Sequence, residues 1–463
     1  MRLNSQTYFR QRVGFPCYAP FIRSCREVID LVARSCLRSI LSRGLDSVNS
    51  QMLALTDWNL STEGVINLCQ ICPYVVLSGR SGICLFGIST VNKPETKKIY
   101  LDDKAGTSEV ICINLEGGFV MQFSINYSTI LPMLQLCRKL KYGDLQEDEL
   151  RQILRHEDYQ FEFSRYKNRV SEEEFTNYFL NLPHLTEDAI TNRDLKVHHN
   201  FYLYLLDNLD FFISKAQELP LYLTQDIFQE QINNALHWLP DGLILPDMKY
   251  VFTLGIGASG GYVFGNGSHY DFIQLIKYQS LDVFCSTLAH ETHHVGFGVI
   301  TKSIDIDSLP LEALFYWSFA GEGLAVKYCN NAEGVISKSI HEGAKNIGLD
   351  SFTWEYLNND FDDTMIHFRE SIRRIRNNEI KSIEELDKHL KEYWMNSWTK
   401  EQQSGDIPKL LHFRLYSFGN DIWGVIHDCF GKDVVYDTLR NPWKFPSVFD
   451  EALQKICRTD LQI

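Results

Sequence analysis

The stretch of sequence that decides the fold is Ser280-Leu-Asp-Val-Phe-Cys-Ser-Thr-Leu-Ala-His-Glu-Thr-His-His-Val-Gly296. Ser280 is a preferred helix N-cap residue, and Asp282 places an acid in the first turn, where the helix dipole favours it. Gly296 is a typical stop just beyond a helix C-terminus. The pattern therefore predicts a helix over residues 281–295.

His290 and His294 stand one turn apart on the same face of this helix. At that spacing their Cβ atoms lie about 6 Å apart, so both imidazoles can reach one zinc ion. Glu291 lies about 100° round the helix from His290, where it can act as general base on a water at the open zinc position. Two polar residues can also be simply solvated, but the apolar neighbours Leu288 and Val295 indicate a half-buried helix. We therefore predict a metal site.

A catalytic zinc needs a third protein ligand. Glu322 is the strongest candidate, because glycines flank it in Ala320-Gly-Glu-Gly-Leu-Ala325 and indicate that another helix approaches closely. Asp305 and Asp307, in a segment that resembles a loop, stay open as alternatives. Glu312 lies near a predicted helix N-terminus, where compensation of the helix dipole explains an acid without any metal.

His290-Glu-Thr-His-His294 followed by Glu322-Gly-Leu-Ala325 resembles the gluzincin class of zinc metallopeptidases. Within that class it is similar to a bacterial group of zinc-dependent peptidases whose motifs read His-Glu-x-His-His and Glu-Gly-x-Ala. Asp158–Tyr166 and Tyr416-Ser-Phe-Gly419 add to the resemblance, which covers about residues 118–463. It implies a metallopeptidase-like fold with zinc as the cofactor. We separately predict a peptide or protein as the substrate.

The resemblance also brings the C-terminal Tyr-x-x-Gly segment towards the zinc. Hydrolysis of an amide needs a donor for the oxyanion, and Tyr416 is the predicted donor because its phenol is neutral at pH 7. His412, one turn earlier on the same face, is the rival, and simple core packing of Tyr416 also stays open. His293 points away from the zinc face and is expected to support the site from behind or to lie at the surface.

Gly255-Ile-Gly-Ala-Ser-Gly260 matches a dinucleotide fingerprint and follows a predicted strand at residues 250–254. That function requires a helix after the glycines, whereas Gly261–Gly267 reads as a loop or hairpin. Two interpretations remain. The strand 250–254 is the edge that pairs with an extended peptide, or the segment is only a glycine-rich hairpin.

Composition excludes several other classes of protein. Hydrophobic residues are 44% and charged residues 22% of the 463, as in globular proteins. Lys and Arg number 45 against 59 Asp and Glu, so the net charge of −14 disfavours nucleic acid. No run approaches the roughly 18 apolar residues of a membrane span. The chain has twelve cysteines, which we expect to be mostly reduced, as in a cytoplasmic protein. We therefore expect the protein to be cytoplasmic. An organelle transit peptide is the alternative explanation of the Arg-rich start, where we favour an amphipathic helix.

The chain divides into an accessory α/β region at residues 1–117 and a zincin-like metallopeptidase domain at residues 118–463. Short β-rich runs lie between Tyr74 and Tyr127, and the chain is mainly helical after Thr129. The fold class is therefore α+β, predominantly α. Helices are expected near residues 129–140, 146–155, 171–182, 199–216, 224–236, 281–295, 310–330, 360–377, 382–396, 408–429 and 447–457.

The functional prediction is a zinc-dependent peptidase with His290, His294 and Glu322 as ligands and Glu291 as base. A metal-dependent hydrolase with a non-peptide substrate is one alternative. The other is a non-catalytic helical interaction protein with a structural zinc. A structural zinc would need a fourth protein ligand, and helical phase places Cys285 and Cys329 off the ligand face.

Overall fold

The computed structural model describes residues 74–79, 82–87, 96–102, 107–114, 122–257, 259–278, 280–396 and 410–463. A boundary between two compact units falls between Ser124 and Ile125. In the first unit, β1 (Tyr74–Gly79) pairs with β2 (Gly82–Gly87), and β3 (Thr96–Asp102) pairs with β4 (Thr107–Asn114), both antiparallel. The Arg-rich start lies outside the described residues, and the division of the chain at residue 117 stays a prediction.

The strands of the second unit follow the order β5 (Gln122–Asn126), β6 (Met248–Thr253), β8 (Gly267–Asp271) and β7 (Gly261–Phe264). β5 begins before the unit boundary, and only its Ile125 and Asn126 belong to this unit. β6 and β8 are parallel, whereas β7 and β8 form an antiparallel hairpin. The predicted strand at 250–254 therefore exists as β6, but the interpretation of it as the edge is wrong, because β5 and β8 flank it. Among the described strands, β7 is the edge beside β8.

Helices make up most of this unit, which confirms the α+β, predominantly α fold class. Before the β7–β8 hairpin they are α4 (Ile130–Tyr142), α5 (Glu147–Leu154), α6 (Glu157–Tyr166), α7 (Glu172–Asn181), α8 (Arg193–Asp207), α9 (Leu209–Tyr222) and α10 (Gln225–Trp238). After it they are α11 (Phe272–Tyr278), α12 (Leu281–Thr301), α13 (Leu311–Ser318), α14 (Ala320–Cys329), α15 (Ser351–Asn359), α16 (Phe361–Arg376), α17 (Ile383–His389), α19 (Arg414–Phe430), α20 (Lys432–Arg440) and α21 (Phe445–Lys455). None of the helices in the described part of the chain is long and apolar enough to cross a membrane.

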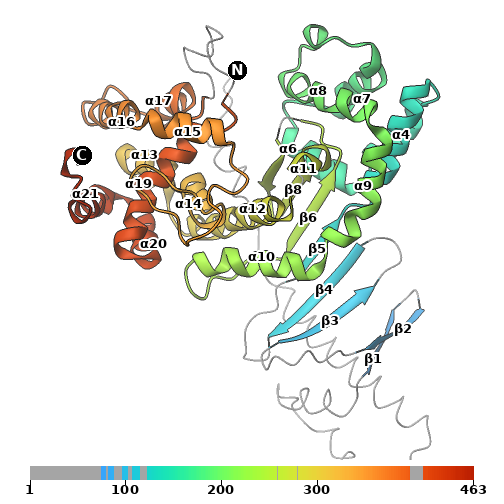
Figure 1. Ribbon diagram of the computed structural model, residues 1–463, viewed down its shortest axis with the longest axis horizontal. Helices are drawn as coiled ribbons and strands as arrows, with labels where there is room; N and C mark the ends of the chain where they lie inside the picture. Colours follow the sequence, from blue (N-terminus) through green and yellow to red (C-terminus); the bar gives the residue numbers. More distant parts are fainter. Residues whose placement is uncertain are drawn as a thin grey trace, which may run out of the picture. The chain divides into compact units, whose positions relative to one another are not determined.

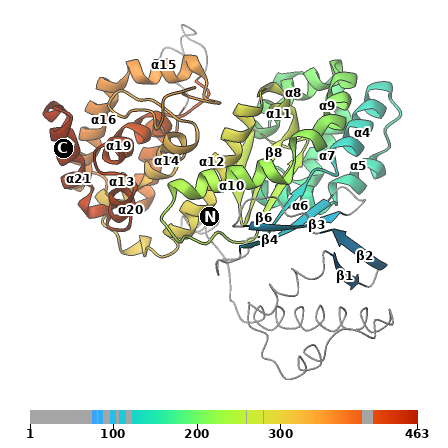
Figure 2. The same cartoon turned by 60° about the horizontal axis from the view of Figure 1, so that its bottom comes forward.

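The long helix α12 lies between the strands β6 and β8 and the C-terminal helices, as Figures 1 and 2 both show. Its start follows the predicted signal, since the Ser280 hydroxyl accepts a hydrogen bond from the Val283 amide at 3.2 Å. The predicted stop at Gly296 is wrong, because the helix continues to Thr301. A Cβ on Gly296 would lie 2.2 Å from a methyl carbon of Leu239. The glycine therefore allows close packing against Leu239 and does not end the helix.

Helices α14 and α19 touch through their glycines, which are Gly323 and Gly419. A Cβ on Gly323 would lie 2.3 Å from the carbonyl carbon of Gly419. A Cβ on Gly419 would lie 2.5 Å from the carbonyl oxygen of Phe319. The close helix approach predicted from the residues flanking Glu322 is therefore confirmed, with α19 as the approaching helix. Gly321 does not contribute, since the nearest atom to its Cβ position is 3.8 Å away.

Several predicted elements differ from the observed ones. The single helix expected over residues 199–216 is wrong, because α8 and α9 share this region, and α13 and α14 divide residues 310–330. The helices α6, α11, α15 and α20 lie outside the expected ranges. In α6 the buried positions include Asp158 and Glu162, so this helix lacks a simple apolar stripe.

Candidate active site

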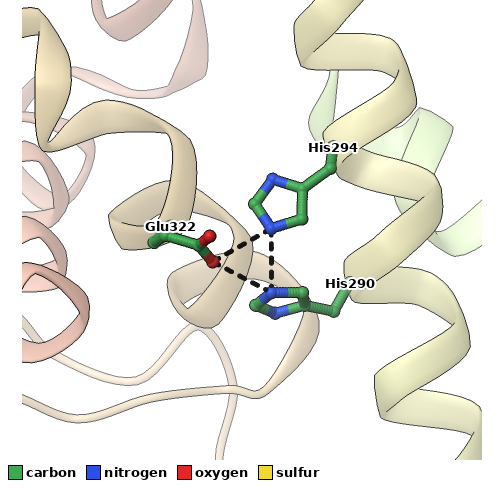
Figure 3. A group of neighbouring side chains, drawn as sticks. All are labelled: His290, His294 and Glu322. Carbon is green, nitrogen blue, oxygen red and sulfur yellow. Dashed lines mark hydrogen bonds and ion pairs between the residues drawn. The ribbon is translucent and has the colours of Figure 1, made fainter. Parts of the chain in front are cut away.

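His290 and His294 project from α12 towards Glu322 of α14, as Figure 3 shows. Nε2 of His294 lies 3.0 Å from Nε2 of His290 and 3.0 Å from Oε2 of Glu322. Nε2 of His290 lies 3.4 Å from the same oxygen. Among the described residues, this is the group of three potential ligands whose donor atoms lie within 4.8 Å of one another. Two imidazoles and one carboxylate form a ligand set that catalytic zinc uses.

Asn330 determines which nitrogen of His290 faces this cluster. The Asn330 amide nitrogen donates to the Ser286 hydroxyl at 3.0 Å and to the Ile347 carbonyl at 2.8 Å, so its oxygen is left to accept. That oxygen lies 2.8 Å from Nδ1 of His290, which must therefore carry the proton. Nε2 then directs a lone pair at a second imidazole and at a carboxylate. A cation fits between these three groups, so the residues present suit a zinc ion.

The charges at the cluster also suit a cation. Burial works against a charge on His290, but the Glu322 carboxylate outweighs burial and raises the pKa of this histidine. Burial likewise opposes the charge on Glu322, yet His294 and His290 hold the pKa of its carboxyl well below the usual range. Glu322 is therefore ionised and favours a positive charge beside it. A divalent cation at the cluster would supply that charge.

Asp305 and Glu312 lie outside the ligand cluster. Asp305 is exposed and does not belong to the cluster. The side chain of Asp307 lies outside the described residues. Glu312 accepts a hydrogen bond from the Tyr316 hydroxyl at 2.6 Å and forms an ion pair with Arg376 at 2.7 Å. These contacts explain Glu312 without a metal.

Glu291 lies one residue after His290 on α12 and is 8% exposed. The edge strand β7 begins against it, because a Cβ on Gly261 would lie 3.2 Å from Oε1 of Glu291. A larger residue at position 261 would crowd this carboxylate. Sequence reasoning did not connect Gly261 with Glu291, and nothing in the local pattern could have done so, since the two residues lie on different elements.

Tyr416 and His412, the two candidate oxyanion donors, are in contact with each other, and Tyr416 also contacts His290. The Tyr416 ring is nearly parallel to that of His290, with centroids 6.5 Å apart, and it lies 5.7 Å from the His412 ring. Nε2 of His412 accepts the backbone N–H of Asp350 at 3.0 Å, so Nδ1 carries the proton of a neutral imidazole. Burial lowers the pKa of His412, which keeps it neutral. Tyr416 also packs against a buried cluster of Val326, Ala332 and Trp354. This contact supports the alternative in which Tyr416 is a packing residue.

His293 lies away from the zinc-facing side, as its helical phase predicted. The alternative expectation of a surface position is wrong, because its exposed fraction is 0%. Its Nε2 lies 3.1 Å from the hydroxyl of Tyr436. Burial places the pKa of His293 well below its usual value, so this side chain is a neutral part of the core.

Asn330 is the residue at this centre that sequence reasoning missed. It directly follows α14, where an asparagine reads as an ordinary helix end. Its contact with His290 spans 40 residues of sequence, so no local signal marks it.

The chain was also compared with known proteins. The model of a family described as "putative zinc dependent peptidase (DUF5700)" matches residues 150–456, which is more than half of the chain. No match was found among curated proteins or among solved structures.

Proposed function

This chain belongs to that family of zinc-dependent peptidases, and we propose that it hydrolyses amide bonds of peptides or proteins with a zinc-activated water. The observation that carries the proposal is the convergence of His290, His294 and Glu322, with the His290 tautomer fixed by Asn330. Two histidines on α12 and a glutamate on α14 are the ligand arrangement expected of a gluzincin, which supports the proposal. A zinc ion bound there would lower the pKa of a water to about 7 and polarise a carbonyl.

The chain's own residues supply the other catalytic functions. Glu291 takes the proton of the attacking water as general base and passes it to the leaving amine. Tyr416 or the neutral His412 donates a hydrogen bond to the oxyanion. The Tyr416 ring lies 6.5 Å from that of His290 and 5.7 Å from that of His412, so both side chains are candidates for this donor.

An extended peptide is the substrate that the edge strand favours. The backbone N–H of Asp271 donates to the carbonyl of Gly260, so this pair belongs to the hydrogen-bonded set of the β7–β8 hairpin. Such pairs alternate along antiparallel strands, and the next one is Tyr262 with His269. Gly261 and Val263 then direct their N–H and C=O groups away from β8. A peptide added along β7 would pass beside Glu291.

A structural zinc is the less favoured alternative. In the described part of the chain, the ligand group has three members, and neither Cys285 nor Cys329 belongs to it. Three protein ligands leave an open position, as catalytic sites do, whereas structural sites are closed by four.

The test begins with the metal content of the purified full chain, measured by mass spectrometry. We expect one zinc per chain, reduced in His290→Ala, His294→Ala and Glu322→Gln and unchanged in the control Glu312→Gln. Peptidase activity is then measured on denatured casein by following new amino termini. Glu291→Gln should keep the zinc and lose about 10²–10⁴-fold in rate, because Gln keeps the shape but not the basic oxygen.

Two results would overturn the proposal. Full zinc in Glu322→Gln together with zinc loss in an Asp305 or Asp307 variant would reject the ligand assignment. A zinc-loaded Glu291→Gln that cleaves casein at the wild-type rate would reject the role of the base.

A further inference from the structure

A loop rich in glycine leads from β6 to the edge strand β7, and its backbone is held by side chains from other elements. We call residues 254–257 and 259–260 the glycine loop. The Leu254 carbonyl accepts from the hydroxyls of Tyr159 and Tyr202, both at 3.2 Å, and the Gly255 carbonyl accepts from Tyr202 at 2.9 Å. The Gly255 amide donates to Asp271 at 3.2 Å. Side chains thus bind the backbone groups of Leu254 and Gly255, as strand partners would in a sheet.

Glu162 of α6 makes the strongest of these contacts. Its Oε1 accepts the Ile256 amide at 2.7 Å, and its Oε2 accepts the Thr253 hydroxyl at 2.8 Å. Glu162 is 1% exposed, so both oxygens exchange water for protein donors. A buried carboxylate is costly unless it is hydrogen-bonded in this way. One side chain thereby joins the end of β6 to the middle of the loop.

Tyr166, one turn further along α6, contacts the far end of the glycine loop. Its hydroxyl accepts the Ser259 amide at 3.3 Å. A Cβ on Gly257 would lie 2.4 Å from the Tyr166 ring, so the loop backbone rests directly on it. Tyr159, Glu162 and Tyr166 recur at intervals of three and four residues, which places them on one face of the helix.

The glycine loop leads directly to the first residue of β7. Gly260 ends the loop and Gly261 begins the strand, and Gly261 borders Glu291 where an extended peptide would pass. We infer that Glu162 is a positioning residue, which holds the glycine loop and thereby fixes β7 at the distance from Glu291 that an extended substrate requires. This inference rests on the proposed function for its substrate, but not for the rigidity of the loop.

Hydrogen exchange tests the positioning role without any substrate. In Glu162→Ala, the amides of residues 254–264 should exchange about tenfold or more faster, because the Ile256 amide loses its acceptor. Residues 286–296 of α12 should exchange as in the wild type. Glu162→Gln keeps one oxygen for the Ile256 amide and should restore most of the protection.

Tyr202→Phe is the second variant, in case Glu162→Ala does not fold. It removes the hydroxyl that holds Leu254 and Gly255 and leaves the ring in place. Tyr178→Phe is its matched control, because Tyr178 also loses a buried hydroxyl contact, here to His199 at 3.1 Å, but does not touch the loop. Exchange at 254–264 should rise in Tyr202→Phe and stay unchanged in Tyr178→Phe.

The activity assay compares a long and a short substrate with the zinc-loaded chain. For denatured casein, kcat/KM should fall about 10²-fold in Glu162→Ala, the loss that a displacement of about 1 Å produces. A blocked dipeptide anilide, which is too short to pair along β7, should lose less than about threefold, since it does not need the strand. Zinc content should not change.

Unchanged exchange at 254–264 in both Glu162→Ala and Tyr202→Phe would overturn the inference. Equal losses for casein and the anilide would also overturn it, since a smaller folded fraction lowers both alike. If the zinc-loaded wild type cleaves neither substrate, the proposed function fails, and hydrogen exchange still decides whether Glu162 positions the loop.

Discussion

Replacement of Asn330 by alanine should weaken zinc binding although Asn330 is not a ligand. Its amide oxygen lies 2.8 Å from Nδ1 of His290 and accepts the proton that this nitrogen carries. Its amide nitrogen donates to the Ser286 hydroxyl and the Ile347 carbonyl. Without it, the His290 ring can rotate or carry its proton on Nε2, and either change removes a ligand. Loss of such a supporting partner typically reduces metal affinity about 10–100-fold, or about 1.4–2.8 kcal/mol.

The same change should also lower stability. Asn330 is 4% exposed, and alanine leaves the buried Nδ1–H of His290 without its acceptor, at a cost of about 1–3 kcal/mol. Asn330→Asp separates the two effects, because the carboxylate still accepts from His290 but cannot donate to the Ile347 carbonyl. We expect Asn330→Asp to bind zinc nearly as the wild type does and to melt at a lower temperature.

Zinc affinity is measured by competition with a chromophoric chelator, and stability by thermal melting of the metal-free protein. Asn330 does not orient His290 if Asn330→Ala binds zinc as tightly as the wild type while His290→Ala does not. Asn330 also does not orient His290 if Asn330→Asp loses as much zinc affinity as Asn330→Ala. The side-chain oxygen at position 330, which only the aspartate keeps, would then make no difference to zinc binding.

Three other outcomes are expected from the structure. Tyr416→Phe should lower kcat on casein about 10²–10³-fold, with KM and zinc content little changed. A large loss of kcat in His412→Ala, with almost none in Tyr416→Phe, would show that His412 is the oxyanion donor. Gly323→Ala should lower the free energy of unfolding by about 1–3 kcal/mol or more, because its Cβ would lie 2.3 Å from the carbonyl carbon of Gly419. In Gly321→Ala the nearest atom to the new Cβ is 3.8 Å away, so this variant should stabilise α14. Equal melting temperatures of the two variants would contradict this packing. Burial, helped by Lys327, lowers the pKa of His427 to about 4, so the unfolded chain binds a proton at this residue at a higher pH than the folded chain does. The melting temperature of the metal-free protein should therefore fall as the pH drops from about 6.5 towards 4. His427→Gln should make this fall smaller, and an unchanged fall would show that His427 does not cause the pH dependence.

The helix that carries His290 and His294 could be predicted because its information is local. His290 and His294 share a face as a consequence of helical periodicity, and Ser280 caps the helix through a neighbour three residues away. Gly323 was predictable for a related reason, since a glycine inside a helix is unfavourable unless another backbone lies close. The family resemblance of these motifs extends over the part of the chain that the family model matches.

Local signals also misled where a glycine has two possible uses. Gly296 looks like a helix stop, but Leu239, which lies far away in the sequence, occupies the space where its Cβ would be. The strand at 250–254 looks like a free edge until the hairpin β7–β8 adds a parallel neighbour to it. In both cases a distant segment decided between two meanings of the same residues.

The sequence by itself therefore determined that His290 and His294 share one helix face beside Glu291 and that the fold is predominantly helical, because each of these depends on spacing within one element. Only the tertiary structure decided that Asn330 orients His290, that Gly261 borders Glu291 and that Glu162 holds the Ile256 amide. The contact between Glu162 and Ile256 spans 94 residues of sequence, and that between Asn330 and His290 spans 40. Side chains that meet across such separations do so only after the helices have packed, so the chemistry of the individual residues predicts what they can do but not what they touch.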